Sequence, residues 1–211
     1  MKMPAMTLIL AAALAAAACS STRYGDPKEV ETINVDWGST DLQNFSQQMI
    51  RSLKDSPQLA YLDHPGKGDD KRVIVYMGGL RNETSEHINT TAVTDVIRTE
   101  MLQSGRFRFV ADSAGQGEIG EQVRFQQESG RVNPEMAKKF GKQLGADVVI
   151  YGTLSSIEKK KGRSIESGGI RTEDTYYLLV LNCVNLESGE IVWAEKSEIR
   201  KTQRTGILGA R

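Results

Sequence analysis

Residues 175–198 read TYYLLVLNCVNLESGEIVWAEKSE, and this stretch decides the fold. Two runs rich in β-branched and aromatic residues, 175–185 and 190–198, predict strands on either side of the turn Glu187-Ser188-Gly189. A link this short joins antiparallel neighbours, because parallel strands need a crossover over the sheet. The preceding run 146–157 predicts a buried strand, and the charged segment 158–174 separates it from the hairpin. The last third of the chain is therefore predicted to be mainly antiparallel sheet.

Towards the N-terminus, strand and helix patterns alternate. Short β-branched or alternating runs predict strands over 72–77, which Gly78-Gly79 bounds, and over 106–110. Four helices are predicted: 41–55 with a capping box of Thr40 and Gln43, one from Asn89 or Thr90 to Gly105, a weaker one over 115–129, and one from Asn133-Pro134 to Gly145. Helices that link the first three strands imply parallel crossovers. The predicted fold class is α/β, a single domain with a mixed parallel/antiparallel sheet of about five strands flanked by about four helices.

The first nineteen residues have the pattern of a signal peptide. Lys2 precedes an apolar run from Met6 to Ala18, about 13 residues long where about 20 are needed to cross a bilayer. Small residues lead into Cys19, and Ser20 follows, which resembles a bacterial lipobox. This predicts cleavage before Cys19 and lipidation (palmitate) of its thiol. The alternative is an ordinary secretory signal that leaves Cys19 as a free thiol.

The predicted organisation has three parts: a lipoprotein signal peptide over 1–18, a lipid anchor and short flexible tether over 19–38, and a globular domain over 39–211. Ser20, rather than aspartate, in the position after the cysteine implies the outer membrane as the destination. The tether, with Pro27 as its one proline, reaches at most roughly 65 Å when fully extended.

Composition excludes several classes of function. The 211 residues carry 27 basic and 27 acidic side chains, so the zero net charge argues against nucleic-acid binding. Two cysteines and two histidines are too few for a zinc cluster or a disulfide framework. The sequence contains no nucleophile elbow, Walker loop, HExxH or dinucleotide fingerprint. We therefore expect no metal, no cofactor, no small-molecule substrate and no catalytic residue.

Three groups of side chains are candidates for chemistry or binding. Glu83, Glu86 and His87 can be imagined as metal ligands or an acid–base set, but a polar surface loop is the commoner explanation. Cys183 lies in an apolar strand and is interpreted as a buried, inert thiol. A basic cluster at a predicted hairpin tip is either a solvated turn or a contact for an acidic partner or an anionic envelope polymer. Its members are Lys159, Lys160, Lys161 and Arg163.

Four segments of the chain carry a family resemblance. They read RNETSEHINT over 81–90, LQSGRF over 102–107, GKQLGAD over 141–147 and ESGEIVW over 187–193. With a lipobox ahead of them, they resemble the LpoB family of outer-membrane lipoproteins, over roughly residues 70–200. The resemblance implies a TolB N-terminal-like domain, anchored in the outer membrane, that faces the periplasm. It also implies a non-enzymatic function in cell-wall biogenesis and cell shape, in which the domain binds and activates a bifunctional (class A) penicillin-binding protein.

Two other functions compete with this interpretation. Single pieces such as the GAD and GEIVW motifs also occur in CsgG-like envelope domains, which suggests a structural subunit of an outer-membrane secretion or assembly complex as the alternative. An envelope hydrolase ranks third, since no nucleophile or carboxylate pair stands in a motif context.

The tether departs from the pattern of the family. The best-known members carry a long, proline-rich linker before the domain, whereas the predicted tether here is short and poor in proline.

Overall fold

A computed structural model describes residues 25–31, 34–60, 67–137, 145–164, 167–206 and 209–210. The predicted signal peptide, Cys19 and His64 lie outside these residues. The chain divides into two compact units, Met1–Val30 and Glu31–Arg211. In the first unit the described residues 25–30 contain a turn, in which the Lys28 amide donates to Asp26 Oδ1 at 2.9 Å. The second unit contains all the helices and strands described below.

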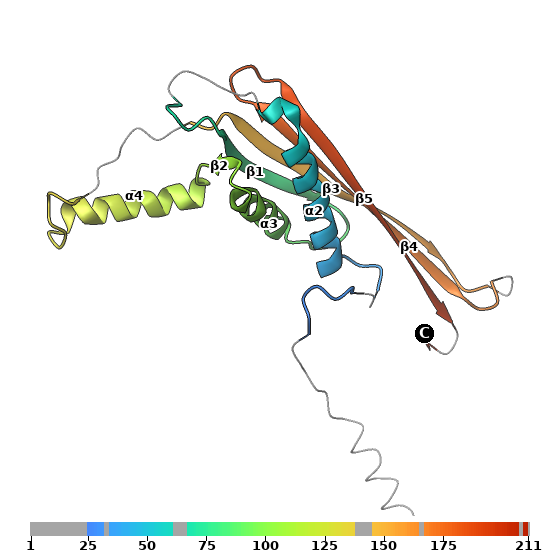
Figure 1. The fold of residues 1–211 in the computed structure, drawn as a ribbon. Helices are drawn as coiled ribbons and strands as arrows, with labels where there is room; N and C mark the ends of the chain where they lie inside the picture. Colours follow the sequence, from blue (N-terminus) through green and yellow to red (C-terminus); the bar gives the residue numbers. More distant parts are fainter. Residues whose placement is uncertain are drawn as a thin grey trace, which may run out of the picture. The chain divides into compact units, whose positions relative to one another are not determined.

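A mixed sheet forms the centre of the larger unit (Figure 1). Its strands lie in the order β2-β1-β3-β4-β5-β6. The strands are β1 (Val73–Glu83), β2 (Phe107–Phe109), β3 (Val148–Lys161), β4 (Arg171–Asn185), β5 (Ile191–Gly206) and β6 (Gly209–Ala210). Strand β1 pairs in parallel with β2 and β3, whereas β3, β4, β5 and β6 pair antiparallel. The predicted α/β fold with a mixed sheet is confirmed, including the division into a parallel and an antiparallel half.

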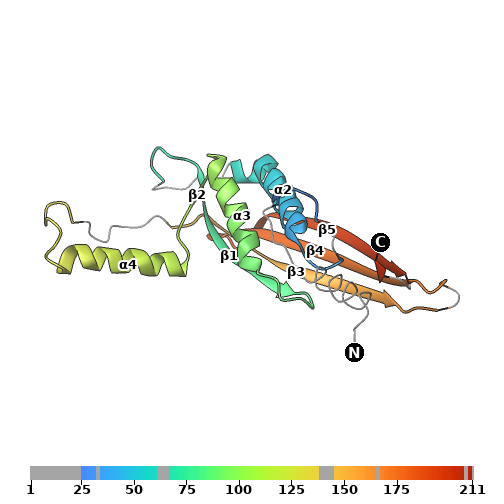
Figure 2. The same ribbon diagram turned by 90° about the horizontal axis from the view of Figure 1, so that it is seen from below.

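The described residues also form three α-helices and a short 3-10 helix. They are α2 (Ser39–Asp55), η1 (Pro57–Ala60), α3 (Thr90–Gln103) and α4 (Ser113–Glu128). Helices α2 and α3 cover the same face of the sheet, as both ribbon views show (Figures 1 and 2). Within the described residues, no helix combines the length and the apolar character needed to span a membrane.

The helix ends test the predicted caps. Asn89 caps α3 by accepting from the amides of Thr91 and Ala92, and Gly105 follows its end with a φ of 69°, both as predicted. Of the helix predicted from Asn133, the described part is a first turn in which Glu135 N donates to Asn133 Oδ1 at 3.0 Å. The remainder of that predicted helix, 138–144, lies outside the described residues.

The predicted cap of α2 is wrong. Gly38 is the N-cap, and its amide donates to the Asp41 carboxylate at 2.9 Å. Thr40 lies inside the helix, and its hydroxyl accepts instead from the amide of Glu31 at 2.8 Å. The Glu31 carboxylate in turn accepts from the amide of Ser39 at 2.8 Å. Glu31, which lies outside the helix, therefore supplies the capping oxygen that Thr40 was expected to supply.

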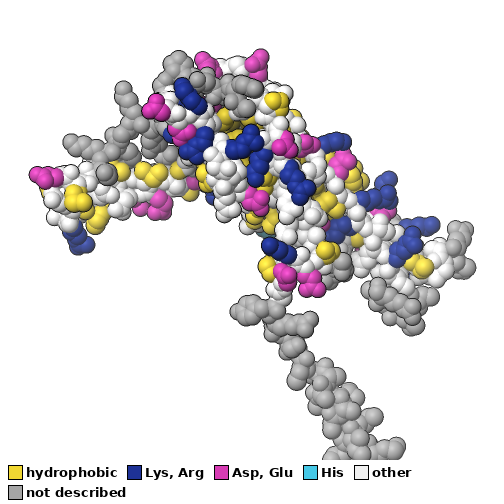
Figure 3. Space-filling model, in the orientation of Figure 1, with side chains coloured by type: hydrophobic (Ala, Val, Ile, Leu, Met, Phe, Trp, Pro, Cys, Tyr) yellow, Lys and Arg dark blue, Asp and Glu magenta, His cyan; other side chains and the backbone are white. Residues whose placement is uncertain are grey.

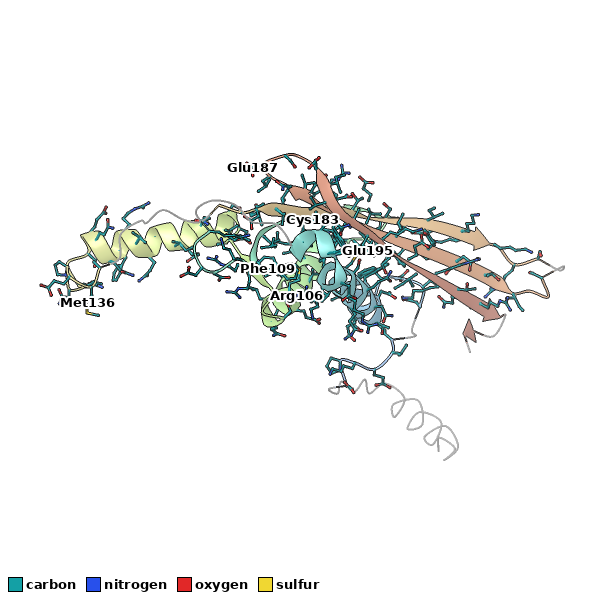
Figure 4. All side chains as sticks on the ribbon, turned by 45° about the horizontal axis from the view of Figure 1, so that its top comes forward. Arg106, Phe109, Met136, Cys183, Glu187 and Glu195 are labelled. Carbon is teal, nitrogen blue, oxygen red and sulfur yellow. The ribbon has the colours of Figure 1, made fainter. Side chains whose placement is uncertain are left out.

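The core lies between the helical layer and one face of the sheet. Phe45, Met49 and Leu53 of α2 are fully buried, as are Ile97 and Met101 of α3. The sheet contributes every second residue of β4 together with alternate residues of β3; these are Tyr177, Leu179, Leu181, Cys183, Val148, Ile150 and Leu154. Polar contacts also join α2 to β5, since Ser52 Oγ donates to the carboxylate of Glu195 at 2.6 Å. Figure 4 shows Glu195 on β5 beside the helical layer.

Two glycines explain an error in the length of β1. The sequence predicted that the strand ends before Gly78-Gly79, but β1 continues to Glu83 through a register shift between Met77 and Leu80. A Cβ on Gly78 would lie 2.9 Å from the carbonyl oxygen of Ile150 on β3. The predicted tight backbone path is therefore correct, and it serves as a bulge within the strand.

The charged segment 158–174 was predicted to lie outside the strands, and this is wrong for its two ends, 158–161 and 171–174. Strands β3 and β4 continue into it, and β5 extends to Gly206, so the three strands project beyond the helical layer (Figures 1 and 2). We call this projecting part, 157–161, 171–176 and 200–206, the ribbon. Its polar sequence lacks apolar alternation, but every residue from Val148 to Lys161 has a partner on β4. Inter-strand pairing therefore extends the sheet where side-chain burial does not.

Candidate functional site

The sheet has one face towards the helices and one face away from them. Side chains alternate along a strand, and residues paired across strands share a face. Tyr177, Leu179 and Leu181 point to the helical layer and are buried. Their neighbours Tyr176, Leu178 and Val180 therefore point to the opposite side, where each is half-buried. We call this side the outer face.

The outer face carries an apolar centre. Tyr151 and Ile157 of β3 are 43% and 58% exposed. Ile157 pairs with Tyr176, and Ser155 between these two β3 positions pairs with Leu178. This surface was not predicted, although alternate apolar residues in the runs 146–157 and 175–185 are its signal. A strand with apolar residues on both of its faces is equally typical of a strand that is buried on both sides. Only the position of the helices shows which of the two faces is core and which is the outer face.

The predicted basic cluster continues the same face into the ribbon. Lys159 and Lys161 lie on the outer face, where Lys161 and Arg204 flank Thr172 on either side of β4. Lys160 points to the other side of the ribbon and pairs with Glu158 at 3.4 Å. Arg163 follows the strand, and its guanidinium donates to the carbonyl of Gly206 at 3.1 Å. The structure thus divides the four predicted residues between two sides and the hairpin loop, and it adds Arg204. On the helix-covered side that Figure 3 shows, basic side chains lie over the helical layer as well as at the ribbon end.

The acidic side chains of the outer face are held by neighbours. Asp174 accepts from the Thr202 hydroxyl and from Arg200 at 2.9 Å, and these bonds lower the pKa of its carboxyl. Glu198 pairs with Lys196 at 2.7 Å, which lowers the pKa of this carboxyl as well. For Lys159 and Lys161 no ion pair occurs within the described part of the chain. The exposed charge at the ribbon end of the face is therefore predominantly positive.

The residues imagined as an acid–base set have separate structural roles. Glu86 accepts from the backbone amide of Trp37 at 2.9 Å and from the hydroxyl of Tyr177. Glu83 is exposed and lies 3.4 Å from Arg81, and the exposed His87 is not part of either contact. Glu86 therefore fastens the segment before α2 to the sheet.

Cys183 lies in the core, as predicted for an inert thiol. Its side chain is fully buried on the helix-covered face, and burial raises the pKa of the thiol to about 12 (Figure 4). Such a thiol remains protonated at neutral pH and is a poor nucleophile. In the described segments, no group of three or more His, Cys, Asp or Glu side chains is arranged to hold a metal ion.

Hollows lined by described residues open on the surface of the larger unit, and two of them bear on function. One, of about 450 Å³, lies beside the end of α2 and is lined by Leu53, Leu59 and Phe107 together with Arg72 and Arg106. The other, of about 230 Å³, lies between the β1 bulge and the start of α3. Arg98 spans the second hollow with ion pairs to Asp95 at 2.7 Å and Asp112 at 3.8 Å. Its charged groups are therefore engaged in ion pairs within α3 and between α3 and the residue that caps α4.

Comparison with protein families gives a match over most of the larger unit. The model described as "Peptidoglycan-synthase activator LpoB" matches residues 41–199. A comparison with curated protein sequences gives no match.

Solved structures with a similar fold include three of LpoB. The LpoB C-terminal domain from Salmonella enterica is 14% identical, with a TM-score of 0.42, over 75% of this chain and 98% of that one. The corresponding domain from Escherichia coli is 16% identical, with a TM-score of 0.40 and the same two coverages. An NMR structure of E. coli LpoB is 15% identical, with a TM-score of 0.38, over 88% of this chain and 85% of that one.

Proposed function

The chain belongs to the LpoB family of peptidoglycan-synthase activators, and from this premise we propose that it binds and activates a bifunctional (class A) penicillin-binding protein in the periplasm. The observation that carries the proposal is the family match, which spans residues 41–199 and so includes the helical layer and most of the sheet. The partner would be a protein, and the chain itself would contribute no catalytic group.

Activation without catalysis requires a difference in affinity. An activator shifts its target towards the active conformation only if it binds that conformation more tightly than the inactive one. A coupling of about 1–3 kcal/mol is typical for such effects and corresponds to about a 5–150-fold change in the conformational equilibrium. A rigid sheet surface suits this role, because a preorganised surface loses little conformational entropy on binding.

We place the protein in the outer membrane, facing the periplasm and held by lipid on Cys19. The signal-peptide pattern before Cys19 and the serine after it support this placement. Lipid on the cysteine would hold the domain on the periplasmic side of the membrane, and the tether would determine how far it reaches.

The alternative of a CsgG-like structural subunit receives no support from these comparisons. The matching family model describes a synthase activator. Such a subunit would form symmetric oligomers, whereas an activator in the proposed sense acts through a contact with a different protein.

A reconstituted synthase assay tests the proposal. Residues 20–211 contain the whole compact unit Glu31–Arg211 and would be purified together with the bifunctional penicillin-binding proteins of the same cell. Glycan polymerisation and peptide cross-linking would be measured with and without the domain, and binding would be measured directly. We expect rates that rise with domain concentration and saturate at the measured dissociation constant.

Heat-unfolded domain is the control for non-specific effects of added protein. Saturable binding with no change in either rate would contradict activation while leaving a binding role. Absence of binding to every bifunctional synthase of the cell would overturn the proposal, and the mass of the domain in solution would then test for symmetric oligomers.

A further inference from the structure

We propose that the outer face of the sheet is the surface that docks on the synthase, and that its counterpart there is an apolar patch bordered by carboxylates. This inference rests on the proposed function and adds the docking surface and the chemistry of the partner. The docking centre consists of Tyr151, Ile157, Tyr176 and Leu178, and the basic border consists of Lys159, Lys161 and Arg204.

The docking centre exposes apolar side chains on a rigid element. The helix-covered face buries its large side chains, whereas Ile157 and Tyr151 on the outer face remain 58% and 43% exposed. They lie on β3, which pairs along its whole length with β4, so their backbone positions are fixed. Contiguous exposed apolar side chains rimmed by polar ones mark interaction sites in soluble proteins. Tyrosine is also enriched among the residues that dominate binding energy at protein interfaces.

The charge of the basic border indicates the chemistry of the partner. Both carboxylates nearest the centre already have cationic neighbours, Asp174 with Arg200 and Glu198 with Lys196. Lys159 and Lys161 project from the same side of one strand, and Arg204 lies across β4 from Lys161. A surface with this arrangement attracts carboxylates and repels basic surfaces. The complementary partner surface is therefore acidic at the border of its contact patch.

A protein surface fits the whole face better than an anionic polymer does. An anionic polymer would satisfy Lys159, Lys161 and Arg204, but it would leave Ile157 and Leu178 without an apolar partner. Interfaces between proteins combine an apolar, aromatic centre with a charged, solvated rim, and the outer face has both parts in adjacent positions. A second copy of the chain is disfavoured, because two basic borders would repel each other.

The centre is tested by a neutral substitution that removes apolar contact. Ile157→Asn in residues 20–211 should weaken binding to the synthase by about tenfold, and stimulation should fall in parallel at subsaturating concentration. Leu102→Asn is the matched control, because Leu102 is 47% exposed on α3, away from the outer face. It should leave binding unchanged. Thermal melting of both variants confirms folding, and Tyr151→Ser provides a second probe of the centre.

The basic border is tested with two double variants, each of which removes two positive charges from one side of the ribbon. Lys159→Ala with Lys161→Ala should slow association and flatten its dependence on salt, since exposed charges act mainly on the rate of encounter. Lys160→Ala with Arg171→Ala removes the same charge from the opposite side of the ribbon, where these residues pair with Glu158 and Glu173. This control should leave the association rate unchanged.

The outcomes separate this inference from the proposed function. If the wild-type domain binds and stimulates the synthase but Ile157→Asn and Tyr151→Ser bind normally, the docking surface is wrong and the activator role stands. If the wild type binds no synthase, the proposed function fails, and the docking inference fails with it. Binding to purified sacculi that Ile157→Asn abolishes, with unchanged synthase binding, would assign the face to the polymer. A dimer that Ile157→Asn dissociates, again with unchanged synthase binding, would assign it to a second copy.

Discussion

At the scale of single residues, Tyr177 and Glu86 hold the segment before α2 against the sheet. The Tyr177 hydroxyl contacts the Glu86 carboxylate and the carbonyl of Val35 at 3.2 Å. Trp37 stacks on Phe45 with ring centroids 5.3 Å apart and meets the edge of Tyr177 at 5.6 Å. Burial, and then the neighbouring Glu86, raise the pKa of Tyr177, so the phenol remains a donor at all physiological pH values. Val35 and Trp37 were predicted to belong to the flexible tether, but they are part of the folded domain.

Tyr177→Phe tests this contact. The substitution removes the donor to a charged acceptor and should lower the free energy of unfolding by about 2 kcal/mol, measured by denaturant titration. Tyr176→Phe is the matched control, since Tyr176 is the next residue along β4 and its hydroxyl bonds the Glu198 carboxylate on the outer face, where solvent can replace that bond. Its loss should be about 0.5 kcal/mol or less. Equal losses for the two variants would contradict the anchoring role of the Tyr177 hydroxyl.

At the scale of elements, the sequence predicted which strands are parallel and which antiparallel, but not the lengths of the strands. The hairpin around Glu187-Ser188-Gly189 forms as predicted, because Asn185 Oδ1 accepts from the amides of Glu187 and Ser188. The ribbon was missed because Lys159 and Lys160 give no apolar alternation, and pairing with Asp174 and Glu173 on β4 supplies the missing stabilisation. Such pairing depends on residues distant in sequence, so a local pattern does not contain it.

The same limit applies to the candidate site. The basic residues were visible as a run, but which of them share a side of the ribbon depends on the register between β3 and β4. The apolar centre was invisible for a different reason. Leu178 and Leu179 are equally apolar in the sequence, and only the helices above Leu179 make one of them core and the other surface.

Two glycines in different elements should respond oppositely to alanine. A Cβ on Gly152 in β3 would overlap the carbonyl oxygen of Val180, so Gly152→Ala should destabilise the fold by about 2–3 kcal/mol. Gly117 lies within α4, where an added Cβ would meet no atom within 4 Å, so Gly117→Ala should stabilise the helix by about 0.5–1 kcal/mol. Denaturant titration measures both. A neutral Gly152→Ala would show that β3 and β4 are further apart than in this structure.

At the scale of the whole molecule, the proposed function is limited by the length of chain between the anchor at Cys19 and the folded domain. Residues from Glu31 onward belong to the larger compact unit, so the stretch between Cys19 and Glu31 could span roughly 40 Å at most if it were fully extended. The predicted tether to residue 38 allowed roughly 65 Å. With a short tether, function depends strongly on where the anchor is placed. A tether that cannot span the distance from the anchor to the synthase gives the domain almost no effective concentration at its binding site.

Cys19→Ser in the full chain tests this dependence. The variant lacks the thiol that we propose as the site of lipidation, and it should fail to restore envelope function in cells deprived of the wild-type protein. Its folded domain should melt at the wild-type temperature. Ser20→Asp is the companion variant, because it retains the thiol but should direct the lipoprotein to the inner membrane. Such an anchor should still allow activation of a synthase held in the inner membrane, since the distance to span becomes shorter. Full function of Cys19→Ser as a released periplasmic protein would show that anchoring is dispensable and that the length of the tether sets no limit.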